Sequence, residues 1–304
     1  VARTKSLEKP FEGCPRNPVF THRHLGRNYP VTCAGHGDLV DDGKGNWYIV
    51  MLACRRCKGC SSMGRETFLA KVQWEDGWPV INPGIGKLEE WLELPQEPVR
   101  FPREAGENLF FQFYGNQLPK ELVSIYGRDS HMYSLHARPG FLRLQAGRHH
   151  VGEKARSTYL GVRQMGYTFT VSAGLEFIPK DSHSGAGVLL FQNHRNFLRA
   201  EIRNENEERT ISVIETIDGQ ERVLGTASIC EGLIEILFQA EEQVGRIYIV
   251  QNGETRPVAE AVDLRPYSTE YAGGFVGCTM GMYASAYGKE SQDYADFAWF
   301  IVKQ

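Results

Sequence analysis

Short apolar stretches separated by glycine-containing turns are the feature that most constrains the fold of this chain. Stretches such as 167–171, 185–191 and 197–202 combine apolar and polar residues, with turn signals about every ten residues. Alternation with a period of two places one face of a strand against a core. No segment shows a helical period for more than a turn or two, and 32 of the 304 residues are glycine. The sequence therefore predicts an all-β protein.

The pattern divides the chain into two regions. In the first, residues 31–40, 47–54 and 66–74 are predicted to form antiparallel strands, and 80–81 a short fourth. Such a sheet has the size of one propeller blade. Residues 83–102 are interrupted by Pro and Gly, which is typical of a linker. We therefore expect one domain over 1–95 and a β-sandwich over 96–304.

Charge and composition exclude several classes of function. The formal net charge is −3 and the pI is about 6.3, which gives no support to nucleic-acid binding. No apolar run has the length of a membrane span, so no membrane partner is predicted. The seven cysteines are an odd number in a long chain, which argues against a disulfide framework and favours a reducing compartment such as the cytoplasm.

Three cysteines lie close together in the first region. Cys54, Cys57 and Cys60 form two overlapping Cys-x-x-Cys spacings. A closed zinc or iron–sulfur site uses four ligands, and Cys33 on a neighbouring strand is the candidate for the fourth. A disulfide and unmodified thiols in a loop are the alternatives, and the spacing does not choose among them.

Several motifs, taken in order, resemble the β-xylosidase/α-L-arabinofuranosidase branch of glycoside hydrolase family 43. In the first region they are Val1-Ala2-Arg3-Thr4-Lys5-Ser6, Pro10-Phe11-Glu12-Gly13-Cys14-Pro15, Asn17-Pro18-Val19-Phe20-Thr21-His22, Gly35-His36-Gly37-Asp38, Gly64-Arg65-Glu66-Thr67 and Asp76-Gly77-Trp78-Pro79. In the second they are Leu118-Pro119, Ser134-Leu135, Arg138-Pro139-Gly140-Phe141-Leu142-Arg143-Leu144, Gly273-Gly274-Phe275-Val276-Gly277 and Ala295-Asp296-Phe297-Ala298-Trp299-Phe300. The combination and its order are specific, although each motif alone is not.

The resemblance implies a fold and an activity. The fold is a partial β-propeller, the last blade or so of five, followed by a concanavalin A-like β-sandwich. The activity is cleavage of β-1,4-xylosidic or α-L-arabinofuranosidic bonds with inversion, acting on xylo-oligosaccharides or arabinofuranosides. Inversion uses one carboxylic acid and one carboxylate. In the family these come from the first three blades, so we expect no catalytic residue in this chain and no activity from it alone.

The resemblance carries three supporting residues into this chain. His36 corresponds to a histidine near the propeller axis, beside a calcium ion or its waters. Arg65 corresponds to an arginine that reaches substrate hydroxyls and the catalytic acids. Phe275 resembles an aromatic residue that the sandwich places over the propeller mouth. The alternatives are a core or turn histidine, a surface or salt-bridge arginine, and a phenylalanine of the sandwich core.

Other charged residues have structural interpretations. Asp38 is expected to have a structural role in the blade, and Glu66 to be an ion-pair partner. The arginines at 195, 199 and 203 alternate with apolar residues, which predicts a solvated sheet face.

An isolated blade leaves its faces and edges unburied. We therefore expect that it packs onto the sandwich, associates with a partner that carries the missing blades or with a second copy in a homo-oligomer, or is part of a longer protein. A non-catalytic carbohydrate-binding or interaction module is the alternative function.

Overall fold

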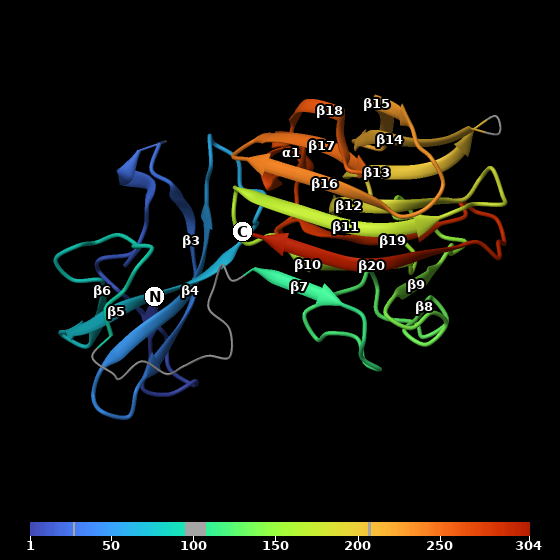
Figure 1. The fold of residues 1–304 in the computed structure, drawn as a ribbon. Helices are drawn as coiled ribbons and strands as arrows, with labels where there is room; N and C mark the ends of the chain where they lie inside the picture. The colour runs from blue at the N-terminus through green and yellow to red at the C-terminus, as the bar shows by residue number, and fades with distance from the viewer. Residues whose placement is uncertain (27, 95–107, 206–207) are drawn as a thin grey trace. The chain divides into compact units, whose positions relative to one another are not determined.

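The computed structural model describes residues 1–26, 28–94, 108–205 and 208–304. The chain forms two compact units, 1–100 and 101–304 (Figure 1). The expected domain boundary between 95 and 96 lies outside the described residues. Described helices are the short η1 (Arg23–Leu25), η2 (Arg265–Tyr267) and α1 (Thr269–Ala272), so the expected all-β class is confirmed. In the described ranges no helix is long and apolar enough to cross a membrane.

The first unit contains the predicted blade. Four antiparallel strands pair in chain order: β3 (Val31–Asp41), β4 (Trp47–Arg55), β5 (Glu66–Glu75) and β6 (Trp78–Ile81). Asp76 and Gly77 both have positive φ, 52° and 72°, and close the β5–β6 hairpin as a two-residue turn. A separate ribbon pairs β1 (Ala2–Arg3) with β2 (Glu12–Gly13).

One face of the blade is covered by segments of the same unit. Ile49 and Met51 of β4 pack with Phe68 and Ala70 of β5, and Leu88 from beyond β6 joins this core. The chain thus buries one face of the sheet without needing another blade.

His22 ties the covering segments to the sheet. Its buried ring bonds to the Val31 carbonyl through Nδ1 (2.7 Å) and accepts the Leu88 N–H through Nε2 (2.9 Å). Because a carbonyl only accepts, Nδ1 carries the proton.

The second unit is a sandwich of two sheets, as predicted (Figure 1). The six-stranded sheet has the order β10-β19-β12-β13-β14-β15, and the eight-stranded sheet the order β18-β17-β16-β11-β20-β9-β8, with β7 also paired to β20. The strand bounds are β7 Leu109–Gln112, β8 Tyr133–Ser134, β9 Leu142–Gln145, β10 Tyr159–Arg163, β11 Phe169–Phe177, β12 Gly185–Asn193, β13 Asn196–Glu205, β14 Glu208–Ile217, β15 Gln220–Ser228, β16 Ile234–Glu241, β17 Val244–Gln251, β18 Glu254–Asp263, β19 Thr279–Ser285 and β20 Tyr294–Lys303.

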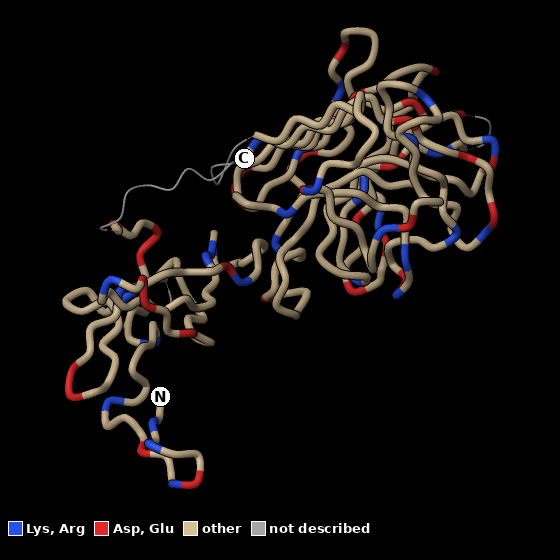
Figure 2. Tube along the Cα trace, turned by 90° about the horizontal axis from the view of Figure 1, so that it is seen from below, with Lys and Arg blue, Asp and Glu red and all other residues tan. Residues whose placement is uncertain are grey.

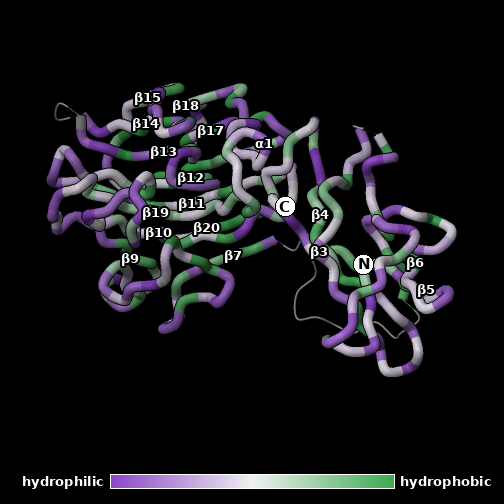
Figure 3. Tube along the Cα trace, turned by 180° about the vertical axis from the view of Figure 1, so that it is seen from behind, coloured by the Kyte–Doolittle hydropathy of each residue, from purple (hydrophilic) through white to green (hydrophobic). Residues whose placement is uncertain are grey.

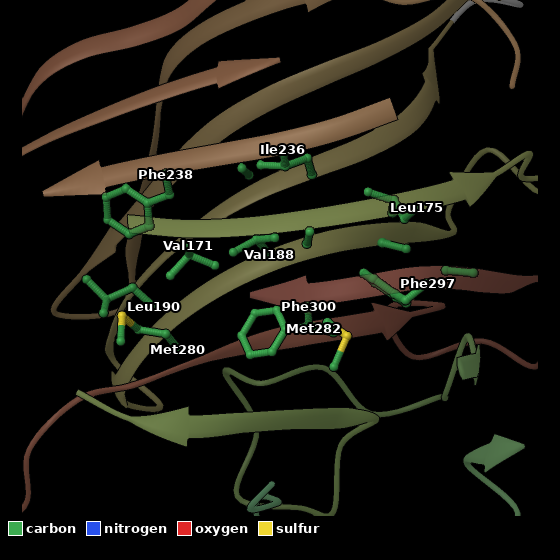
Figure 4. Close-up of a cluster of buried hydrophobic side chains, with 14 of the residues drawn as sticks. Val171, Leu175, Val188, Leu190, Ile236, Phe238, Met280, Met282, Phe297 and Phe300 are labelled. Carbon is green, nitrogen blue, oxygen red and sulfur yellow. The ribbon is translucent and has the colours of Figure 1, made fainter. Parts of the chain in front are cut away.

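Alternate residues of the two sheets meet in one core. Val188 and Leu190 of β12 face Val171 of β11 and Phe300 of β20 in this cluster (Figure 4). Hydrophobic residues follow the strands, whereas many connecting loops are hydrophilic (Figure 3). Basic and acidic residues are interspersed over both units (Figure 2). The core is therefore formed by every second residue of the strands, as the two-residue period of the sequence predicts.

The opposite face of the six-stranded sheet contradicts the prediction of a solvated arginine stripe. Arg199 is only 1% exposed, and its Nη1 contacts Glu221 Oε1 at 2.8 Å. The buried Glu201 accepts hydrogen bonds from Arg203 and from the hydroxyls of Tyr283 and Tyr287. The prediction holds for Arg195, which is exposed, and was wrong for Arg199, because alternation marks a second face but does not say what covers it.

His150 packs on this buried cluster. Its ring contacts Phe197 and Tyr287 edge to face, with centroids 5.9 and 5.0 Å away. Burial lowers the pKa of His150, and the nearby Arg199 charge lowers it further. Burial also raises the pKa of Tyr287, which keeps its hydroxyl protonated as a donor to Glu201.

We predict that Glu201→Ala destabilises the second unit by about 3–5 kcal/mol, because it removes the buried carboxylate that pairs with Arg203 and accepts hydrogen bonds from two tyrosine hydroxyls. Denaturant unfolding followed by circular dichroism measures this change. Glu241→Ala is the matched control, since its ion pair with Arg246 is long (3.7 Å) and largely exposed; it should cost less than about 1 kcal/mol. A loss of that small size for Glu201→Ala would contradict the stabilising role.

The buried imidazole also predicts a pH dependence. Because the folded-state pKa of His150 lies below its unfolded value, the unfolded chain binds the proton more tightly. Its contribution to stability is therefore complete above about pH 6.5 and is lost as the pH falls towards the folded-state pKa. Unfolding free energies measured from pH 8 to pH 5 should show a shallower decline in His150→Gln than in the parent chain. Identical slopes would refute the assignment.

Candidate functional site

The Gly35-His36-Gly37-Asp38 motif lies where β3 is doubly bulged. Thr32 pairs with Cys54, Gly35 with Leu52 and Asp38 with Val50. From one pair to the next β3 advances by three residues and β4 by only two, so each interval of β3 contains one extra residue. Each bulge contains a residue with positive φ, Cys33 at 56° and His36 at 51°. Such conformations are costly for residues other than glycine and are concentrated at functional sites.

The bulge places the imidazole of His36 at the surface of this unit. A Cβ on Gly37 would lie 2.7 Å from Ile49 Cδ1, so only glycine allows β4 to approach this closely. His36 itself is exposed. Of the alternative of a core or turn histidine, this exposure contradicts only the core position. A bulge re-aims a side chain, and here it turns His36 away from the apolar face of the blade.

Arg65 lies near the same end of the blade. It follows Gly64, which has φ of 68°, and immediately precedes β5. Gly35, Leu52 and Thr67 form one row across β3, β4 and β5. His36 comes one position after Gly35, and Arg65 two positions before Thr67, on the other side of this row, with β4 between β3 and β5. Arg65 is exposed, as His36 is.

The loop between β4 and β5 is tightly folded. Cys57 and Cys60 exchange backbone hydrogen bonds of 2.9 and 3.0 Å, and Lys58 and Gly59 between them have positive φ. Cys60 is buried. In residues 1–26, 28–94, 108–205 and 208–304 no group of three or more His, Cys, Asp or Glu side chains is placed to hold a metal ion. The geometry therefore does not support a cysteine metal site.

Glu66 confirms its predicted role as an ion-pair partner. Its carboxylate receives two hydrogen bonds from Arg55, at 2.9 and 2.7 Å. Arg55 also lies 3.7 Å from Glu90, which connects the strand to the segment beyond β6. These contacts hold the first residue of β5, next to Arg65, in place.

Phe275, in the second unit, lies at the tip of a loop. Gly273 and Gly274 both have positive φ and turn the chain before β19 begins at Thr279. Phe275 is 67% exposed. It is therefore not a residue of the sandwich core.

Two side chains that sequence reasoning missed hold this loop. Gln192 is buried, and its Nε2 donates to the carbonyls of Gly273 and Val276, both at 3.3 Å. Asn193 Nδ2 donates to the Ala272 carbonyl at 3.1 Å. The two residues end β12, about eighty positions earlier in the chain, and no local pattern indicates that they contact this loop.

Both units match known protein families. Residues 1–79 match the model of glycosyl hydrolases family 43, and residues 111–303 match that of the beta-xylosidase C-terminal concanavalin A-like domain. The chain belongs to glycoside hydrolase family 43. It is the C-terminal portion of such a protein, with the end of a β-propeller followed by a concanavalin A-like sandwich.

Relatives and solved structures agree with this membership. A xylosidase/arabinosidase of Butyrivibrio fibrisolvens is 47% identical over the whole chain, which covers 59% of that protein. The structure of the Bacteroides ovatus xyloglucan PUL GH43B protein superposes with a TM-score of 0.92 at 29% identity, over 99% of this chain and 60% of that one. A xylan β-1,4-xylosidase of Bacillus halodurans gives a TM-score of 0.88 at 26% identity, over 100% of this chain and 59% of that one. This family-43 chain thus spans about three fifths of these relatives.

We predict that Gln192→Leu loosens the Phe275 loop. Two hydrogen bonds are lost, each of net worth about 0.5–1.5 kcal/mol, so amide exchange in 272–277 should quicken about 5- to 100-fold. Hydrogen–deuterium exchange with mass spectrometry measures this. Gln145→Leu is the control, because its amide binds the Ser291 and Asp293 carbonyls of a different loop. Equal exchange in 272–277 for Gln192→Leu and the parent chain would show that Gln192 does not hold the loop.

Proposed function

We propose that this chain is the C-terminal part of an inverting glycoside hydrolase that cleaves β-1,4-xylosidic or α-L-arabinofuranosidic bonds. The observation that carries the proposal is the doubly bulged β3, which exposes His36 two strands away from the exposed Arg65. The similarity over the whole chain to a xylosidase/arabinosidase supports the substrate class. The general acid and base come from residues outside this chain, and the chain alone is inactive.

Arg65 is proposed to bind substrate hydroxyls and a catalytic carboxylate. A guanidinium group donates up to five hydrogen bonds in a fixed plane, which suits a sugar with adjacent hydroxyl groups. Its positive charge also favours the ionised form of a neighbouring carboxylic acid, and the base of an inverting reaction must be ionised. Its place directly before β5, beside the Arg55–Glu66 ion pair, gives it a firm backbone support.

His36 is proposed to order water around a calcium ion in the longer protein. Calcium takes six to eight oxygen ligands, and the described residues contain no group of three or more that could hold a metal directly. An exposed imidazole fits a position in the outer shell, where it hydrogen-bonds to coordinated water. When bound, the ion would supply positive charge near the sugar.

Phe275 is proposed to stack on a sugar ring. The face of an aromatic ring carries partial negative charge, which attracts the C–H groups on one face of a sugar. The two hydrogen bonds from Gln192 restrain the 272–277 loop before substrate binds, which lowers the entropic cost of the contact between Phe275 and the sugar.

We predict background rates when this polypeptide is incubated with an aryl β-xyloside or an aryl α-L-arabinofuranoside, because the proposed general acid and base are not among its residues. Release of the chromogenic aglycone measures the rate. If the chain alone hydrolyses either substrate and His36→Ala abolishes that hydrolysis, the proposal is contradicted. A complete catalytic centre would then lie within these residues.

A chimaera tests the supporting residues. It joins this chain to the part of the Butyrivibrio fibrisolvens relative that the chain does not match. We predict that Arg65→Ala lowers kcat/KM about 100- to 1,000-fold through lost charge-assisted hydrogen bonds. His36→Ala should lower it about 10- to 100-fold and raise the calcium concentration needed for half-maximal activity.

The control for the chimaera is Arg195→Ala, whose ion pair with Asp218 is exposed in the sandwich. It should leave kcat/KM unchanged. An active chimaera in which Arg65→Ala and Arg195→Ala behave alike would exclude Arg65 from the site.

A further inference from the structure

The sandwich contains a cleft apart from His36 and Arg65. It has a volume of about 500 Å³ and lies at the β10 edge of the six-stranded sheet. We call it the Tyr126 cleft. Its lining comes from the 123–126 segment, β10, the end of β12, and the 276–279 segment, with Tyr126, Phe191 and His194 among its residues. Small-molecule sites typically have volumes of about 300–1,000 Å³.

An exposed aromatic side chain forms one wall of the cleft. Tyr126 is 56% exposed and has φ of 57°, a conformation that non-glycine residues rarely adopt. Its hydroxyl lies 2.8 Å from His194 Nε2, and the two rings are nearly parallel at 5°. The hydrogen bond holds the tyrosine ring at the cleft although most of that ring contacts solvent.

His194 is itself held in place. Its Nδ1 lies 3.3 Å from the Val151 carbonyl, which can only accept, so Nδ1 carries a proton and neutral Nε2 accepts from Tyr126. Phe191 packs edge to face against the imidazole with centroids 6.0 Å apart. Three aromatic side chains thus form a preorganised surface, which reduces the cost of ordering them on binding.

Polar groups complete the cleft. Arg163, at the end of β10, is exposed and makes no ion pair within the described part of the chain. Thr279 contributes a hydroxyl that accepts a hydrogen bond from Tyr159 at 2.8 Å. None of the described lining residues is acidic. A flat aromatic wall facing hydrogen-bond donors suits a ligand with apolar C–H faces and hydroxyl edges.

We propose that the Tyr126 cleft binds a neutral pentose oligosaccharide as a second saccharide site of this protein. One ring would stack on Tyr126, with Arg163 donating to its hydroxyls. The choice of pentose rests on the proposed function, whereas the existence of the site rests on the cleft itself. A second site lets the protein hold a polysaccharide chain while cleaving its ends, by raising the effective concentration of the substrate.

Isothermal titration of the 304-residue chain with xylotetraose, and separately with arabinotetraose, tests the proposal. We expect one site with a dissociation constant between about 0.1 and 5 mM for at least one sugar, typical of a shallow cleft. Tyr126→Ala should weaken binding at least tenfold. Tyr126→Phe keeps the ring and should weaken it less than threefold, and circular dichroism checks that both variants are folded.

Two further variants locate the site. Phe275→Ala should retain the affinity, since that ring is on the loop tip and does not line the cleft. Tyr114→Ala removes another exposed tyrosine of the same unit and should also retain it. Absence of binding, or binding lost in Phe275→Ala but kept in Tyr126→Ala, overturns the proposal.

The outcome is separable from that of the proposed function. An active chimaera together with a chain that binds neither sugar would refute the cleft alone. Tyr126-dependent binding together with an inactive chimaera would refute the hydrolase assignment and leave the cleft standing. Tyr126→Ala in the chimaera should leave turnover of small aryl glycosides unchanged.

Discussion

The two-residue period of antiparallel strands is the constraint on which the rest of this structure depends. Because of this period, Val188 and Leu190 lie in the sandwich core, whereas Leu189 and Phe191 lie on the opposite face of the same sheet. A one-residue shift reverses every side chain on a strand. The core therefore sets the register, and the register decides which residues remain available for chemistry or for ligands.

The candidate site uses local exceptions to this period. The two bulges of β3 insert one residue each, and the second exposes His36 while Gly37 keeps β4 close. The glycine turn before Phe275 has a similar effect in the other unit, by ending the regular structure and exposing an aromatic ring. The β3 bulges hold two non-glycine residues at positive φ, whereas the loop before Phe275 uses two glycines, which adopt positive φ without steric cost.

Charged side chains are also buried in the sandwich, where they form a network of hydrogen bonds and ion pairs. Glu201, Arg199 and two tyrosine hydroxyls are removed from water together, so each polar atom of the carboxylate finds a donor. Such a network is costly to desolvate and costly to break. It also explains why a charged, alternating stretch is not always a solvated face. The segments that cover it, including His150, come from distant parts of the chain.

The sequence by itself determined the all-β class, most strand positions and the family, because alternation, turn residues and ordered motifs are local properties. It also indicated His36, Arg65 and Phe275. Only the tertiary structure decided that Phe275 is exposed, that Arg199 is buried, and that Gln192 and Asn193 hold a loop eighty residues away. The same is true of the Tyr126 cleft, which joins four separate segments. These outcomes depend on which surfaces meet, and contacts between residues far apart in sequence leave no local pattern.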